Sequence, residues 1–188
     1  VYRSATPLAP GQWSFSAATG AGSMKDIEQE STIPTGHVEL SARRGILEDL
    51  DMGLKLYLAG SELNATWRVH RGDWSVALAP YLSVYRSRES PATSDALHLF
   101  AGSAVVGSKD LHEKWRLSTG PLGGYGLYAP STGGSAQGAW LGAFVNVERH
   151  IGDHWALVPE LSLYRVVTGD VPVDGGSAQL GLGLRWTP

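Results

Sequence analysis

The 188-residue chain contains no cysteine, which excludes disulfide bonds and thiolate metal sites. It also has no apolar run that approaches the ~20 residues of a membrane-spanning helix. Charged residues make up 18% of the chain, compared with roughly 25% in an average soluble domain. The formal net charge is −3, so no basic surface indicates a nucleic-acid partner.

A basic and then apolar leader is likewise missing, and the chain begins at Val1 rather than at methionine. We interpret it as a mature chain from which any signal peptide has been removed. The length predicts one domain, residues 1–188, with enough chain for a sizeable core. Residues 1–11 contain two prolines and are predicted to form an irregular lead-in.

What the chain has in abundance is strict alternation of apolar and polar residues. In the run 155–164 one face would carry Trp155, Leu157, Pro159, Leu161 and Leu163. A period of two predicts a β-strand, since no helix would place these residues on one side. The run 141–148 alternates likewise, and the short polar sequence RHIGDH joins the two runs. Residues 137–166 are therefore predicted to form a β-hairpin.

Similar alternating runs recur along almost the whole chain. Besides the hairpin they cover about 12–18, 35–43, 51–58, 62–70, 74–85, 96–106, 115–128 and 177–186. An open sheet of this size would leave two unpaired edges, which closure removes. We predict an all-β, closed, antiparallel up-and-down transmembrane barrel of about ten strands. Three in-strand prolines (Pro80, Pro121 and Pro159) are expected to cause bulges or bends, and eight strands is the alternative if they end strands.

The polar face of these strands is rich in small residues. It carries Gly120, Gly124, Gly126, Gly142, Gly181 and Gly183. Small residues suit the crowded concave side of a narrow barrel, whereas the leucine-rich face suits lipid. The alternative is a soluble lipocalin-like barrel, which would need an apolar cavity and a hydrated outer face.

Six tryptophans open or close strands in a pattern that places all of them at one end of the barrel. They are Trp13, Trp67, Trp74, Trp115, Trp155 and Trp186. Amphipathic indole rings are typical of a membrane interface, so these residues are predicted to form an aromatic girdle. The turns at this end are short, and most connections at the other end are longer, as in bacterial outer-membrane barrels with short periplasmic turns.

In its architecture the chain resembles the small bacterial outer-membrane β-barrel proteins, over nearly all of its length and without a subfamily motif. The resemblance implies a Gram-negative outer membrane as the location. It implies contact with outer-membrane lipid and lipopolysaccharide, and it is compatible with other envelope proteins as partners. No metal or cofactor is expected.

Several charged residues fall on the face assigned to the lumen. They are Glu39, Arg43, Lys55, Arg68, Arg116, Glu148, Glu160 and Arg185. They are able to pair into a polar plug or to line a pore. Side chains just fill an eight-stranded barrel, and ten strands leave only slightly more room, so we favour the plug.

Two further regions bear on function. The longest predicted loop, residues 19–33, carries charged residues and is the candidate extracellular binding loop, with Lys25, Asp26, Glu28 and Glu30. His98 with Asp95 and Ser87 or Ser90 is the one local catalytic candidate, but proximity in sequence is not catalytic geometry. We predict a non-catalytic barrel acting as membrane scaffold, surface-binding protein or envelope-assembly subunit. A narrow pore for ions or small polar solutes, and a lipid- or peptide-acting enzyme at the rim, are the alternatives.

Overall fold

The computed structural model describes residues 3–26, 31–88, 95–130, 134–169 and 176–188. Its strands are β1 (Trp13–Asp26), β2 (Ser31–Leu47), β3 (Leu50–Tyr57), β4 (Gly60–His70), β5 (Ser75–Arg88), β6 (Asp95–His112), β7 (Trp115–Pro130), β8 (Ala136–Ile151), β9 (Trp155–Gly169) and β10 (Gly176–Trp186). In the described part of the chain, no helix is long and apolar enough to cross a bilayer.

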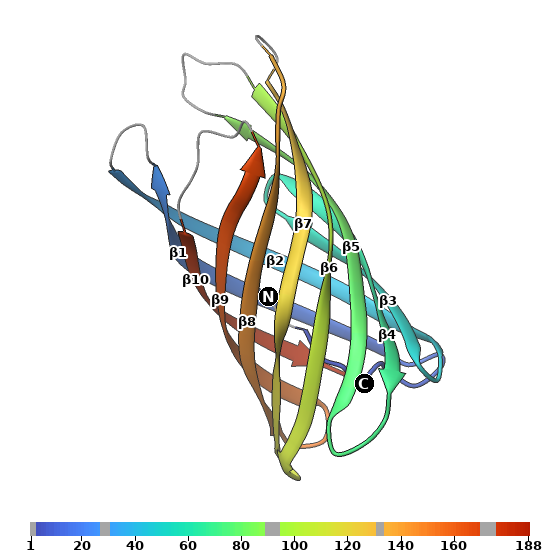
Figure 1. The fold of residues 1–188 in the computed structure, drawn as a ribbon. Coiled ribbons are helices and arrows are strands. Elements are labelled where there is room, and N and C mark those ends of the chain that lie inside the picture. Colours follow the sequence, from blue (N-terminus) through green and yellow to red (C-terminus); the bar gives the residue numbers. More distant parts are fainter. Residues whose placement is uncertain (1–2, 27–30, 89–94, 131–133, 170–175) are drawn as a thin grey trace.

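The strands form a closed antiparallel barrel (Figure 1). Every strand pairs with its neighbours in sequence, and β1 closes the barrel by pairing with β10 from Phe15↔Trp186 to Met24↔Ser177. The predicted closed, up-and-down, ten-stranded architecture is confirmed. Closure leaves no strand edge unpaired, which is the arrangement that satisfies backbone groups inside a membrane.

Alternation along each strand separates an apolar outer wall from a polar interior. The outer wall exposes large apolar side chains on every strand; Leu180, for example, is 65% exposed. The interior holds acidic groups such as Glu39 and Glu148, which are 2% and 1% exposed. A water-soluble protein rarely exposes so large a continuous apolar surface. This polarity is that of a barrel surrounded by lipid, and it excludes the lipocalin-like alternative.

The in-strand prolines do not break or shift the strands. Beside Pro80, paired positions of β4 and β5 stop at Asn64↔Tyr81 and resume at Trp67↔Leu78 in the same register. The register shifts of the sheet lie elsewhere, for example between Gly45 and Leu47. The expectation of bulges at the prolines is therefore wrong. The strand loses backbone pairing on one side only, and its register does not change.

Several strands are longer than the alternation predicts. The prediction of a loop at residues 19–33 is wrong, because β1 runs to Asp26 and β2 begins at Ser31. These strand ends read TGAGSMKD in β1 and STI in β2. They carry no clear apolar alternation, yet their backbones pair in continuous register.

Residues 3–9 of the lead-in form no strand or helix, and residues 3–8 lie inside the barrel. Its Pro10 forms a bridge to Gly45 of β2, and Ala5 is fully buried against Ala77, Val106 and Phe144 of the inner wall. The segment therefore belongs to the barrel interior.

Candidate functional site in the barrel interior

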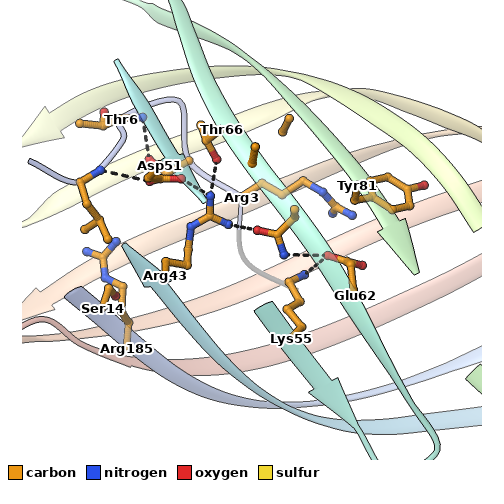
Figure 2. A pocket seen from close by; sticks show the side chains of 15 residues that line it. Arg3, Thr6, Ser14, Arg43, Asp51, Lys55, Glu62, Thr66, Tyr81 and Arg185 are labelled. Atoms are coloured by element: carbon orange, nitrogen blue, oxygen red, sulfur yellow. Dashed lines mark hydrogen bonds and ion pairs between the residues drawn. The ribbon is translucent and has the colours of Figure 1, made fainter. Parts of the chain in front are cut away.

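A cluster of polar side chains links β2, β3 and β4 near the end of the barrel that carries the tryptophans. Figure 2 shows Arg43 of β2 between Asp51 and Thr66. Arg43 forms an ion pair with Asp51 and donates to the side-chain oxygen of Asn64, and its Nη2 lies 2.7 Å from Oγ1 of Thr66. Alternation on three adjacent strands directs all four side chains inward, and together they satisfy a buried guanidinium.

A second ion pair joins β8 to β10. Arg185 donates to the carboxylate of Glu148, and Nε2 of His150 lies 2.8 Å from the same carboxylate oxygen. The Glu148 side chain is 1% exposed and that of Arg185 is 14% exposed. Removing one member of such a buried pair leaves a charge without its partner, which is costly.

Higher in the lumen, Glu62 receives three donors. Its Oε1 lies 3.3 Å from Lys55 Nζ and 3.1 Å from Asn64 Nδ2, and its Oε2 accepts a hydrogen bond of 2.9 Å from the Tyr57 hydroxyl. On the other side of the barrel Glu160 accepts hydrogen bonds from Ser162 at 3.0 Å and from Asn146 at 3.3 Å. These charged side chains therefore cross the lumen in hydrogen-bonded groups.

The N-terminal segment, residues 3–10, completes the filling. Arg3 Nη1 lies 3.3 Å from Glu160 Oε1, and the Leu8 amide donates to Asp51 at 3.1 Å. The cavity that remains beside Arg3, Arg43 and Glu62 has a volume of about 40 Å³, which is room for a few water molecules.

Outside the membrane span, an ion cluster holds the β2–β3 turn against the β4–β5 turn. Asp49 Oδ1 lies 2.7 Å from Arg68 Nε and 2.7 Å from Arg71 Nη2. Hydrogen bonds from Arg68 and Arg71 lower the pKa of Asp49 below its ordinary value of 3.8. The cluster ties two adjacent turns together while the carboxylate is ionised.

This cluster gives a pH prediction with a definite sign. Because the pKa of Asp49 is lowered by folding, its stabilising contribution is present above the ordinary carboxyl pKa and is lost as pH falls through the lowered value. We expect Arg71→Gln to raise the Asp49 pKa toward 3.8, measured by NMR titration of the carboxyl carbon. Lys114→Gln in another turn should leave it unchanged, and an ordinary Asp49 pKa in the unmodified protein would contradict the cluster.

The structure places the predicted lumen residues at two levels. Glu39, Lys55 and Glu160 are buried deep in the lumen, and Arg43, Glu148 and Arg185 form the ion pairs described above. Arg68 and Arg116 instead reach the rim, where Arg116 Nε lies 2.7 Å from Asp110, a residue whose side chain is 66% exposed.

Among the charged lumen residues of these ion pairs, the prediction missed Arg3, Asp51 and Glu62. Asp51 lies on the same strand face as Gly53, and Glu62 lies on the same face as Asn64. The alternating pattern therefore assigns both residues to the lumen. Arg3 lies in a segment without periodicity, and nothing in the sequence placed it in the lumen.

The six predicted girdle tryptophans all face outward, with 38–55% of each residue exposed. Trp155 and Trp186 are paired across β9 and β10 with ring centroids 6.3 Å apart. Arg44 and Arg149 lie over the rings of Trp13 and Trp115 at 5.5 and 5.2 Å. The arrangement is what a membrane interface would favour, and its role there remains our proposal.

The other candidate regions fall partly outside the described residues. Lys25 and Asp26 belong to β1, whereas Glu28 and Glu30 lie outside the described residues. His98 stacks against Tyr85 at a centroid distance of 4.5 Å and contacts Tyr128 at 4.9 Å. Ser90 and the side chains of Ser87 and Asp95 lie outside what the structure describes, so the geometry of this candidate set is not tested. Among the described side chains, no group of three or more His, Asp or Glu residues is arranged to hold a metal ion.

Solved structures with the same fold have several functions. Neisserial surface protein A is 13% identical, with 93% of this chain and 96% of that one covered and a TM-score of 0.55. An outer membrane channel from Pseudomonas putida F1 is 9% identical, with 98% of each chain covered and a TM-score of 0.59. The outer membrane protease OmpT of Escherichia coli is 10% identical, with 95% and 96% covered and a TM-score of 0.51.

No protein-family model matches the chain, and no curated protein sequence matches it either. Identities this low establish a shared fold and nothing finer. The fold and the apolar outer wall of this chain are those of a bacterial outer-membrane β-barrel.

Proposed function

We propose that this protein is a non-catalytic barrel of the bacterial outer membrane, with a closed lumen. It acts through its surface, as a membrane scaffold, a surface-binding protein or a subunit of a larger envelope assembly. Its immediate partners are outer-membrane lipid and lipopolysaccharide. The observation that carries the proposal is the filled interior, in which Arg3 pairs with Glu160 and leaves a cavity of about 40 Å³.

A pore is the second candidate, because a ten-stranded barrel is slightly wider than one that its own side chains fill completely. One of the structurally similar proteins is an outer membrane channel. In the present chain, however, the space that an open pore would use is occupied by residues 3–8. A rim enzyme has weaker support, because no positioned acid, base and nucleophile occur together among the described side chains.

The test is conductance of the purified barrel in a planar bilayer. We expect no discrete current steps from protein that is folded, as shown by a heat-dependent shift in its migration on detergent gels. Folding has to be shown on the same sample, because the absence of current from unfolded chains does not test whether the lumen is closed. Reproducible steps from the folded, unmodified chain would overturn the closed-lumen proposal and favour the pore.

A further inference from the structure

Hydrogen bonds attach the N-terminal segment to the inner wall along its length. At the tryptophan end Gly11 N donates to Gly45 O at 2.8 Å, and Gly45 N donates to Gln12 O at 2.9 Å. Above this, the Leu8 amide donates to Asp51, and the Ala5 amide donates to Ser108 Oγ at 2.8 Å. These attachments involve β2, β3 and β6, so the segment is seated on several parts of the wall.

The wall is shaped to accept this segment. A Cβ added at Gly45 would lie 2.0 Å from the carbonyl oxygen of Ala9, so only glycine permits the approach. Ala5 has no exposed surface and packs in a niche that includes Val106, Leu122 and Phe144. A larger or charged side chain at position 5 would not fit without moving the segment away.

The top of the segment presents a cation to a matching site. The Arg3 guanidinium lies 3.3 Å from Glu160 and 5.2 Å from the ring centre of Phe144. Asn146 donates to the Arg3 carbonyl at 2.9 Å and also to Glu160, which positions the carboxylate and the segment together. Figure 2 shows the guanidinium directed toward Tyr81, with Glu62 and Lys55 on the neighbouring wall. A carboxylate and an aromatic face together recognise a guanidinium.

The charge at this level depends on Arg3. The described wall contributes the carboxylates of Glu39, Glu62 and Glu160 and the ammonium of Lys55, all of them buried. Arg3 brings a second positive charge. Without it, three carboxylates would face one ammonium, and the lumen would carry net negative charge that attracts cations.

The segment is not part of the barrel's own hydrogen-bond ladder. The closed sheet runs from β1 to β10 and is complete without residues 3–8. Displacing these residues therefore removes the filling and leaves the pairing of every strand in place.

From this geometry we propose that residues 3–8 are a tethered ligand of a guanidinium site formed by Glu160, Phe144 and Asn146, and that displacing them opens a cation-selective pore. The vacated site binds an arginine-bearing peptide supplied from outside. The inference rests on the proposed closed lumen, since a barrel that already conducts would have no need of displacement.

The experiment compares three proteins in planar bilayers: the full chain, a variant lacking residues 1–8, and full-length Ala5→Asp. We expect silence from the full chain and steady steps from both variants, with a reversal potential in a KCl gradient that shows preference for K⁺. Ala5→Asp keeps the whole chain and covers the case in which the shortened protein does not fold. Adding Glu160→Gln to either variant should reduce the preference for K⁺.

A peptide of residues 3–10 then probes the site in trans. It should block the current of the shortened barrel, and blocking with the same peptide carrying Arg3→Ala should need at least about tenfold more, because a charge-assisted hydrogen bond is lost. Current steps from the full chain would overturn the closed lumen itself. Silence of both variants in folded form, or a block that does not depend on Arg3, would overturn the tethered-ligand inference and leave the closed lumen standing.

Discussion

Leu180→Arg is expected to lower the free energy of unfolding by ~2–4 kcal/mol, the cost of arginine on the lipid face near the bilayer midplane. Leu180 lies near the middle of β10 and is 65% exposed on the outer wall. In lipid, the guanidinium would lose its hydration without gaining a partner. The measurement is urea unfolding of the barrel reconstituted in lipid vesicles, followed by tryptophan fluorescence.

The matched control is Leu58→Arg, the same change in the turn between β3 and β4. Leu58 is 89% exposed, and near the membrane surface the cost should fall to ~0–1 kcal/mol. The two substitutions introduce the same side chain at different depths in the membrane. Equal and small costs at both positions would mean that water surrounds both residues, which would contradict the lipid-facing wall.

Glu148→Gln is expected to cost ~3–5 kcal/mol, the range for removing one partner of a buried ion pair. Glu148 is 1% exposed and pairs with Arg185 across the gap between β8 and β10. The substitution keeps the size of the side chain and removes its charge, so the guanidinium of Arg185 stays buried beside a neutral amide. Unfolding in urea, compared with the unmodified protein, measures the loss.

Two further variants make this second prediction specific. Asp110→Asn breaks the ion pair with Arg116 at the rim, where the Asp110 side chain is 66% exposed, and should cost at most about 1 kcal/mol. The double change Glu148→Met with Arg185→Met should recover much of the stability, since an apolar pair avoids the desolvation penalty. If Glu148→Gln costs no more than Asp110→Asn, the pair is hydrated and the lumen is not closed at that level.

Much of the fold could be predicted because a period of two is a local property. Leu157, Leu161 and Leu163 alternate with Glu160 and Ser162, and this pattern is visible without any knowledge of strand pairing. The closed ten-stranded barrel follows from repeating it. The strand ends were harder, since residues 19–23 are threonine, glycine, alanine and serine, and their pairing is decided by the register of the neighbouring strand.

The sequence predicts which residues face the interior, but it does not predict which of them pair with each other. Alternation assigned Glu148 and Arg185 to the lumen, yet the pair is 37 residues apart, and only the register of β8, β9 and β10 brings the two together. Arg3 could not be assigned at all. Its segment has no periodicity, and its position depends on a niche built from β5, β6, β7 and β8.

The most direct test of the closed lumen is the reactivity of a thiol placed on the segment itself. The chain has no cysteine, so Ala5→Cys introduces a single thiol at a position that has no exposed surface. In the folded barrel we expect this thiol to react with a water-soluble maleimide roughly a hundredfold or more slowly than the thiol of Leu58→Cys. A buried thiol reacts only during the time in which the segment has left its niche. Similar rates for the two variants would show that the segment lies outside the lumen, and would contradict the account.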